Sequence, residues 1–220
     1  MIDLKIFNQL ENNFDFLNYL SEKDKNIFIE NANYYEFQKG HILMNAEEKF
    51  CDIFYMVLNG SIKVSKISEE GREVVLYRIG KGEICIVNAS CILGKTVFSA
   101  TATVEYDAKI IAIPSYIVSN YLIQDSKFQK FLCSNILLKM EEIVMKFEDV
   151  TFKTINDRVL DFLELESLRR NSNIIYITHE ELAYEIGSVR EVASRSLKSL
   201  ENQGVLKLDR GKITILNMEL

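Results

Sequence analysis

Apolar side chains recur along the 220-residue chain with two different spacings. Over residues 2–31, and again from residue 116 onward, they lie three or four positions apart, the period of an amphipathic helix. Over residues 34–113 the spacing falls to two, and glycines interrupt the runs at intervals typical of turns. We predict helices, then about eight short antiparallel strands that close as a barrel or jelly roll, then further helices. A small barrel of this kind can enclose one small ligand.

A long helix is predicted to begin at Asp125 or Ser126, either of which can cap its first turn. In its second half, apolar residues lie four, three, four and three positions apart, a repeat of 3.5 that is typical of a coiled-coil seam. A helix lying on its own barrel would bury a broader stripe. We interpret it as the dimerisation helix of a parallel homodimer, helped by barrel contacts because the seam covers barely two heptads. Its residues are Leu132, Ile136, Met140, Ile143, Phe147 and Val150.

Residues 178–204 have the pattern of a helix-turn-helix. Thr178 and Glu181 form a T-x-x-E capping box, which starts a helix of about two turns. Gly187 follows and can adopt the positive φ that a sharp exit from this helix requires. A second helix then continues with apolar positions three and four apart. We assign its buried side to Val189, Val192, Leu197 and Leu200.

The other side of this second helix carries side chains that can read base pairs. Arginine can form a bidentate bond with guanine O6 and N7, and glutamate can accept a bond from cytosine N4 in the major groove. The alternative is a solvated helix face with ion pairs such as Glu191–Arg195. A predicted hairpin, with its turn at residues 209–212, supplies the wing of a winged helix and favours base reading. The candidate DNA-binding residues are Arg190, Glu191, Ser194, Arg195, Thr178, Ser188, Lys198, Lys207, Arg210 and Lys212.

Composition narrows the class of protein. Hydrophobic residues make up 48% and charged residues 26%, as in an ordinary soluble protein. No run of 18 apolar residues occurs and the acidic N-terminus lacks a signal-peptide layout, so we expect a cytoplasmic protein without a membrane partner. The net charge of −6 argues against bulk attraction to nucleic acid. Residues 187–212, however, carry six basic and three acidic side chains, a net charge of +3 that fits a specific DNA binder.

The order of barrel, long helix and winged helix resembles the Crp/Fnr family of bacterial transcription regulators, over nearly the whole chain. Its most specific parts are LNGSIKV at residues 58–64 and RExxSR, which starts at Arg190. In that family the matching positions read a TGA-containing half-site, which implies that Glu191 and Arg195 contact its G·C pair. Ser194 resembles the Fnr branch, with TTGA-type half-sites, and Arg190 the cyclic-AMP-receptor branch, with TGTGA-type half-sites. The outer base therefore stays open.

The resemblance implies an α+β fold and a homodimer that binds double-stranded DNA as an inverted repeat and contacts RNA polymerase. We expect a cyclic-nucleotide-binding-like β-barrel sensor domain over residues 1–124, a dimerisation helix over 125–151 and a winged helix-turn-helix over 152–220. Two other functions were weighed: a ligand-binding regulatory module that acts through protein contacts, and a cupin-like enzyme. RExxSR and the basic wing favour the DNA binder. Because no metal triad or nucleophile–base pair occurs, we expect no enzymatic activity.

The predicted sensor departs from the family's known branches. The cyclic-nucleotide cassette, F-G-E…R-S-A, holds the phosphate with its arginine, but Phe98 stands at that position here, so cyclic AMP is not expected. No cysteine precedes Cys51, so an iron–sulfur cluster of the N-terminal type has no ligands. Haem needs an axial ligand, for which His41 is the candidate, although its place after Gly40 in a turn is typical of a surface residue. No cofactor is predicted, and haem is left open.

Cys85 and Cys91 lie where the cassette would be, in a segment that resembles a family branch with C-x5-C and no known ligand. A continuous strand would hold them about 20 Å apart, too far for a disulfide. A turn at residues 88–90 could bring them close enough to act as a redox sensor. The alternative is two buried thiols that pack the barrel, in a chain whose cysteines are reduced.

Overall fold

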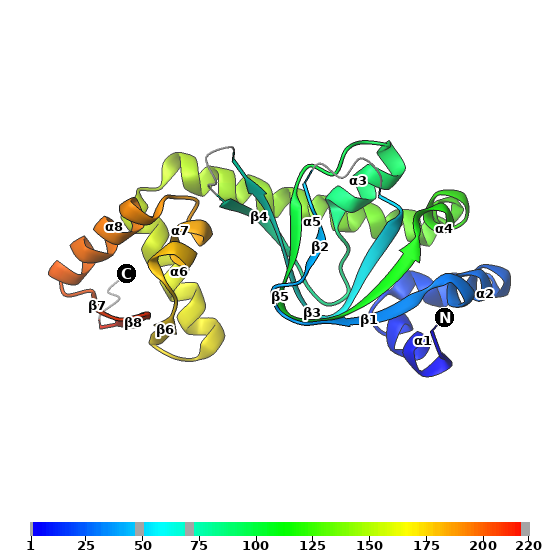
Figure 1. The fold of residues 1–220 in the computed structure, drawn as a ribbon, viewed down its shortest axis with the longest axis horizontal. Helices are drawn as coiled ribbons and strands as arrows, with labels where there is room; N and C mark the ends of the chain where they lie inside the picture. The colour runs from blue at the N-terminus through cyan, green and yellow to red at the C-terminus, as the bar shows by residue number, and fades with distance from the viewer. Residues whose placement is uncertain (1, 47–50, 69–72, 217–220) are drawn as a thin grey trace. The chain divides into compact units, whose positions relative to one another are not determined.

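In the computed structural model the described residues form two compact units, each with its own core (Figure 1). Strand β4 (Glu73–Ile79) and helix α5 (Ser126–Phe152) both run across the boundary between the units. Among the described residues, no helix combines the length and apolarity needed to cross a bilayer. The structure describes residues 2–46, 51–68 and 73–216; the first unit is residues 1–66 with 76–143, and the second is 67–75 with 144–220.

Three short helices open the first unit, as predicted for residues 2–31. They are α1 (Leu4–Glu11), the 3₁₀ helix η1 (Asp15–Tyr19) and α2 (Glu22–Asn31). Ser21 caps α2, since its hydroxyl accepts a hydrogen bond from the amide of Asp24. The apolar faces of these helices share one core with the start of α5. Fully buried side chains in this core include Leu10, Phe14, Leu17, Phe28 and Phe128.

An antiparallel sheet follows, with fewer and longer strands than predicted. The described residues form five strands in this sheet, in the order β1-β5-β3-β4, with β2 also paired to β5. The expectation of about eight short strands is wrong, because β3 continues through Gly60, which the glycine pattern marks as a turn, and β5 is likewise one long curved strand (Figure 1). The strands other than β4 are β1 (Asn33–Phe37), β2 (Ile42–Met44), β3 (Ile53–Ile67) and β5 (Thr101–Pro114).

Gly60 marks an irregularity inside a strand and not a turn between two strands. It has φ of 89° and lies inside β3, where the pairing with β5 shifts register between Val57 and Ile62. A Cβ atom at Gly60 would lie 2.4 Å from the carbonyl oxygen of Asp107 in β5, so only glycine permits this approach of the strands. The irregularities bend the strand without ending it. In sequence, a bulge of this kind is indistinguishable from a turn.

The segment in which a turn at residues 88–90 could have brought two cysteines together is helix α3 (Ile86–Gly94). Its first turn is capped by the Sγ of Cys85, which accepts a hydrogen bond from the amide of Asn88. The fully buried Asn88 side chain bonds the backbone of β3, at the carbonyl of Ile53 (3.0 Å) and the amide of Tyr55 (3.3 Å). These bonds hold α3 against the start of β3.

The long helix forms where it was predicted. After α4 (Ser115–Asn120) and the 3₁₀ helix η2 (Leu122–Gln124), the carboxylate of Asp125 accepts hydrogen bonds from the amides of Lys127 and Phe128. Asp125 is therefore the residue that caps α5. The first half of α5 packs into its own unit through Phe128, Leu132, Asn135 and Lys139.

The second unit has the winged helix-turn-helix arrangement that the sequence predicted. A three-stranded sheet of order β6-β8-β7 packs with three helices around one apolar core. That core includes Val159, Leu163, Ile175, Leu182, Leu197 and Ile213. The elements are α6 (Ile155–Arg170), β6 (Ile174–Tyr176), α7 (His179–Glu185), α8 (Arg190–Asn202), β7 (Leu206–Asp209) and β8 (Lys212–Ile215).

Candidate functional site

The turn between α7 and α8 is closely determined by local contacts. The predicted capping box is present: Thr178 Oγ1 accepts from the amide of Glu181 (3.1 Å), and the Glu181 carboxylate accepts from the amide of Thr178 (2.8 Å). Gly187 has φ of 63°, and a Cβ there would lie 3.1 Å from Cγ2 of Val150. Ser188 in this turn is only 6% exposed, which removes its side chain from the exposed candidate set.

Helix α8 presents one packed face and one open face. Val189 precedes the helix as its N-cap residue and is 37% exposed, so its assignment to the buried side is wrong. Arg190, Glu191 and Arg195 are exposed on the first two turns. The face that packs into the core consists of Ala193, Ser196, Leu197 and Leu200.

The open face of α8 carries hydrogen-bond donors that the helix itself does not use. Arg195 Nε donates to the backbone carbonyl of Glu191 at 3.4 Å, and the ion pair of the alternative interpretation does not form between these two described side chains. Because the Arg195 guanidinium has five N–H donors, most of them stay available for a planar partner such as a guanine edge.

Ser194 has a partner that sequence reasoning missed. Its hydroxyl lies 2.8 Å from Nδ1 of His179, the first residue of α7, and both side chains are half-buried. His179 therefore connects the two helices of the motif. No sequence signal indicates a contact between residues 15 positions apart on different helices.

The hairpin places further cations on the surface. Arg210 and Gly211, with φ of 67°, form the tip between β7 and β8, and both Lys207 and Arg210 are exposed. Lys212 pairs with Asp209 at 3.3 Å, and in α8 Lys198 Nζ lies 2.6 Å from Glu201 Oε2. The Lys198 hydrogen bond holds the pKa of Glu201 below its usual range. Exposed ion pairs of this kind contribute little to the stability of the fold. A DNA phosphate can therefore replace the carboxylate as the partner of the lysine.

The face of α5 that remains open differs from the predicted seam. Leu132 is 7% exposed in the core of its own unit, and Ile143 packs partly against that unit's second core cluster, so neither offers a free apolar face. The other four predicted seam residues are exposed, with Met140 at 59% and Phe147 at 69%. Two of these four, Met140 and Phe147, join two further exposed residues, Leu137 and Val144, in an open seam spaced three, four and three along the helix.

The cysteine pair in the structure is not the predicted one. Cys91 forms a disulfide with Cys51, and the Cα atoms are 5.9 Å apart. Cys85 is a buried free thiol and Cys133 an exposed free thiol. Since α3 begins just after Cys85, the helical rise separates Cys85 from Cys91 by about 9 Å. The possibility that a turn brings Cys85 and Cys91 together is therefore not realised. The expectation of reduced cysteines is wrong at Cys51 and Cys91.

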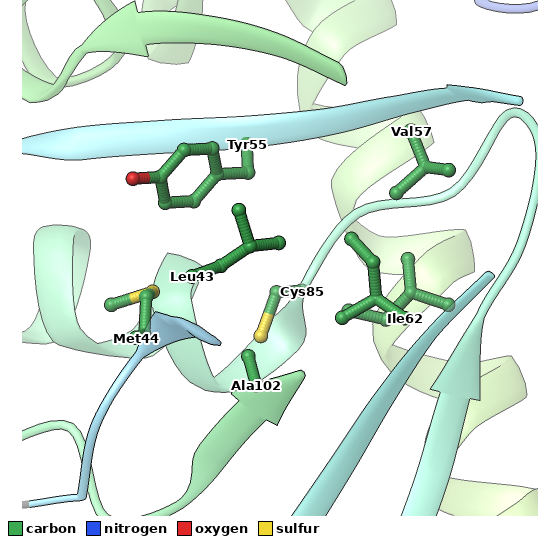
Figure 2. A pocket seen from close by; sticks show the side chains of 8 residues that line it. Leu43, Met44, Tyr55, Val57, Ile62, Cys85 and Ala102 are labelled. Carbon is green, nitrogen blue, oxygen red and sulfur yellow. The ribbon is translucent and has the colours of Figure 1, made fainter. Parts of the chain in front are cut away.

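A small apolar hollow lies inside the first unit. Figure 2 shows a small apolar hollow lined by Cys85 and neighbouring side chains, among them Met44, Tyr55 and Ala102. Its volume of about 10 Å³ is room for about one water molecule. Cys85 Sγ lies 3.6 Å from the hydroxyl of Tyr77, and burial raises the pKa of both groups, so the thiol stays protonated.

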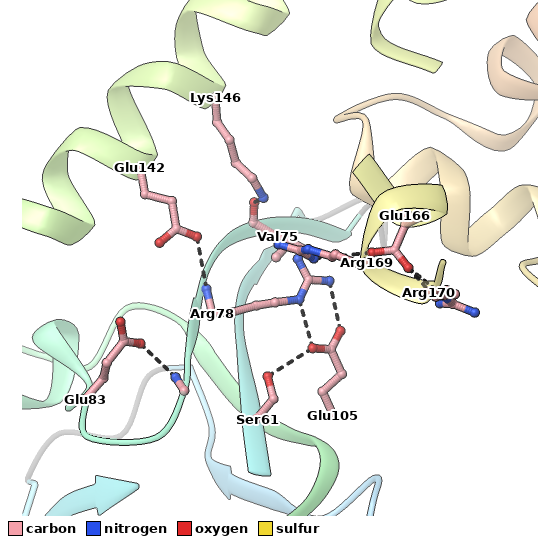
Figure 3. Close-up of polar contacts among 11 residues, drawn as sticks. Ser61, Val75, Arg78, Glu83, Glu105, Glu142, Lys146, Glu166, Arg169 and Arg170 are labelled. Carbon is pink, nitrogen blue, oxygen red and sulfur yellow. Dashed lines mark hydrogen bonds and ion pairs between the residues drawn. The ribbon is translucent and has the colours of Figure 1, made fainter. Parts of the chain in front are cut away.

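The groups where a nucleotide cassette would stand are already engaged. Phe98, in place of the expected arginine, is fully buried in the core. Glu83 accepts from the amide of Gly80 (2.7 Å, Figure 3) and pairs with the buried Lys139 of α5 (2.9 Å). With the Glu83 carboxylate paired and a buried phenylalanine where the phosphate-binding arginine is expected, these residues do not fit a cyclic nucleotide.

Metal or haem ligands do not cluster within residues 2–46, 51–68 and 73–216. No group of three or more His, Cys, Asp or Glu side chains suited to a metal ion occurs there. His41, the candidate haem ligand, is exposed, and its ring stacks on Phe37 with centroids 4.4 Å apart. That stacked, exposed position is the surface environment expected from its place after Gly40.

Comparison with known proteins agrees with this architecture. The Crp-like helix-turn-helix domain family matches residues 157–220, and the cyclic nucleotide-binding domain family matches residues 35–125. The structure of a Crp/Fnr family transcriptional regulator from Eubacterium rectale is 31% identical, covers 95% of this chain and 96% of its own, and superimposes with a TM-score of 0.86.

Two regulators of Thermus thermophilus are similar in sequence. The transcriptional regulator SdrP is 24% identical over 76% of this chain and 81% of its own length. The cyclic AMP receptor protein is 26% identical over 73% of this chain and 74% of its own length. Both alignments extend well beyond a single domain.

Proposed function

The chain belongs to the Crp/Fnr family of transcriptional regulators, and on this premise we propose that it is a homodimer that reads an inverted repeat with TGA-containing half-sites. The observation that carries the proposal is the open face of α8, where Arg190, Glu191 and Arg195 are exposed while the opposite face packs into the core. A rigidly seated helix with such a face is suited to the major groove.

The proposed readout assigns one role to each exposed group. Arg195 bonds the guanine of the TGA core, and Glu191 accepts from the cytosine amine of the same base pair. Arg190 and Ser194 lie beside the outer base, where Ser194 is already oriented by His179. Thr178, at the N-terminus of α7, and Lys198, on α8, lie near the backbone of the DNA.

We propose dimerisation through the open seam of α5. Two copies related by a two-fold axis would bind an inverted repeat whose half-sites lie about one helical turn of DNA apart. This arrangement divides the chain into a sensor over residues 1–124, the dimerisation helix over 125–151 and the DNA-binding domain over 152–220. The bound dimer would regulate transcription through contacts with RNA polymerase, and no step requires enzymatic activity.

The hairpin cations are expected to contact phosphates rather than bases. Replacing either Lys207 or Arg210 by alanine should weaken binding to all sequences alike and lower the slope of log K against log salt by about one, because one counterion fewer is released. Gel-shift titrations over salt, on the specific site and on scrambled DNA, measure both quantities. A loss confined to the specific site would show that the hairpin reads bases.

Cyclic nucleotides are not expected to be the effector. Because Glu83 is paired with Lys139 and Phe98 fills the interior, neither cyclic AMP nor cyclic GMP should bind with useful affinity. Isothermal titration calorimetry of the full-length protein should give no binding heat up to millimolar nucleotide. Saturable binding with a micromolar Kd would contradict this expectation.

Selection of bound duplexes from a random DNA pool tests the proposed function. We expect enrichment of an inverted repeat whose half-sites contain TGA and lie about one helical turn apart. A ligand-binding module that acts only through protein contacts would enrich no sequence. Enrichment of single, unpaired half-sites would support DNA reading but reject the dimer.

A further inference from the structure

The Cys51–Cys91 disulfide and the hydrogen bonds of Asn88 both hold α3 to the start of β3. Asn88 and Cys91 lie three positions apart, on one face of α3. Asn88 bonds the backbone of Ile53 and Tyr55, and Cys91 is joined to Cys51, two residues before β3 begins. Breaking the disulfide would remove the covalent attachment and leave the Asn88 hydrogen bonds and the apolar packing of α3 on β3.

The residues just before α3 contact α5 through a hydrogen bond and an ion pair. The amide of Ile84 donates to Asn135 Oδ1 at 3.3 Å, and the neighbouring Glu83 pairs with Lys139 at 2.9 Å. Lys139 also pairs with Glu142 at 3.1 Å. Asn135, Lys139 and Glu142 lie on one face of α5. A shift of α3 would therefore pull directly on the residues that anchor the helix.

Glu142 strengthens this anchor through the adjacent strand. Its second carboxylate oxygen accepts a hydrogen bond from the amide of Arg78 in β4 at 3.4 Å, which Figure 3 shows beside the Arg78–Glu105 pair. The ammonium of Lys139 is thus enclosed between two carboxylates, each bound to a separate backbone amide. A buried cation held in this way has few alternative positions. A movement of Glu83 would therefore move Lys139 and the part of α5 that carries it.

The chemistry of the pair favours reversibility. If the protein binds DNA as proposed, it works in the compartment of the chromosome, where small thiols generally keep cysteines reduced. A disulfide in that setting is more often a redox device than a permanent crosslink. Cys51 and Cys91 are both buried, at 8% and 4% exposed, so Cys51 is the less buried of the two sulfurs and the one a small thiol reaches first. Cys85, buried and protonated, is not suited to this exchange.

We propose that Cys51 and Cys91 form a reversible thiol–disulfide site for low-molecular-weight thiols and disulfides, whose state sets how firmly α3 and α5 are held. Its effect on DNA affinity rests on the function proposed above. In the oxidised form α5 is anchored before DNA binds, so less ordering remains to be done on binding. The oxidised dimer is therefore the tighter DNA binder.

The exchange balances in two steps. A small thiolate attacks Sγ of Cys51, the Cys51–Cys91 bond breaks, and the Cys91 thiolate leaves and takes up a proton. A second small thiolate then attacks the mixed disulfide, releasing the Cys51 thiol and one molecule of small disulfide. Two electrons pass from the two small thiols to the protein. Oxidation is the reverse reaction, with a small disulfide such as glutathione disulfide as the oxidant.

The test equilibrates the full-length protein in buffers of reduced and oxidised glutathione at several ratios. Free thiols are counted by maleimide labelling, and DNA affinity is measured by gel shift on the selected inverted repeat. We expect the thiol count to rise by two on reduction and the affinity to fall about tenfold, equivalent to 1.4 kcal/mol. Cys51→Ser and Cys91→Ser should show the reduced affinity in every buffer, whereas Cys85→Ser and Cys133→Ser should respond like the wild type.

Separate outcomes test the chemistry and the transmission. Lys139→Met, or the milder Glu83→Gln if the first variant does not fold, should keep the change in thiol count but lose the change in affinity. A thiol count that never changes would overturn the reversible site. A changing count with constant DNA affinity would overturn the link to α5.

Failure of DNA binding itself would look different. If neither redox form distinguishes the inverted repeat from scrambled DNA, the proposed function fails, and the thiol site is then judged by hydrogen exchange. Amides of residues 86–94 should lose protection on reduction in the wild type and not in Cys91→Ser. Equal protection in both forms would overturn the proposal without reference to DNA.

Discussion

Replacing Met140 and Phe147 together by glutamate is expected to convert the dimer into monomers and to weaken binding to the inverted repeat at least about a hundredfold, because bivalent contact with two half-sites is lost. Both side chains are exposed in the open seam of α5. In the dimer each carboxylate would be buried against an apolar surface without a partner. Sedimentation velocity measures the assembly, and gel shifts measure the affinity.

The matched control places the same two charges elsewhere. Leu165 and Leu168 are exposed on α6, at 50% and 72%, so Leu165→Glu with Leu168→Glu adds equal charge outside the seam. This control should remain dimeric and bind DNA like the wild type. A Met140→Glu, Phe147→Glu protein that still sediments as a dimer would show that the seam is not the interface.

Arg195→Ala is expected to weaken binding to the preferred site about ten- to a hundredfold, which corresponds to the roughly 1–3 kcal/mol of one bidentate base contact. Binding to scrambled DNA should scarcely change, since nonspecific affinity comes mainly from phosphate contacts. Because Arg195 is exposed and bonds only within its own helix among the described residues, folding should be unaffected. Gel-shift titrations on both DNAs give the ratio of the affinity for the preferred site to the affinity for scrambled DNA.

Arg169→Ala is the matched control for this prediction. Arg169 is an exposed arginine on α6 that pairs with Glu166 at 3.2 Å, so its loss also removes one positive charge from the DNA-binding domain. Both variants change the net charge equally, and only Arg195→Ala should change specificity. An equal decrease for both variants would mean that Arg195 acts through its charge alone.

The second unit could be predicted because its signals are local. The Thr178–Glu181 capping box, the positive φ of Gly187 and the hairpin turn each depend on residues within a few positions of one another. Helical periodicity then places Leu197 and Leu200 on the buried side of α8. It is wrong at Val189, where the helix has not yet begun, and Val192 is only half-buried. Because these signals are all local and agree with one another, the fold of this short domain can be predicted from its sequence.

The first unit was harder because its structure depends on distant contacts. Gly60 bends a strand instead of ending it, owing to the approach of Asp107 from β5. Cys91 pairs with Cys51, 40 positions away, and no spacing rule distinguishes this partner from Cys85. The helical path of α3 follows from burial of Asn88 against β3, which periodicity does not reveal.

The open seam of α5 shows the same limitation at a finer scale. The heptad spacing predicts which residues could face a partner, but Leu132 already packs against the helices at the start of the chain. Ile143 likewise packs against the sheet of its own unit. Leu137 and Val144 take their place on the exposed side. Periodicity locates an apolar face, and tertiary packing decides which part of it remains free.

A missing-contact measurement tests most directly whether α8 reads bases. The affinities of wild type and Arg195→Ala are compared on the selected site and on a site whose TGA guanine is changed to adenine in both half-sites. The wild type should lose about ten- to a hundredfold on the changed site, and the variant should bind both sites equally, since the contact is already absent. If Arg195→Ala discriminates between the two sites as strongly as the wild type, Arg195 does not read that guanine.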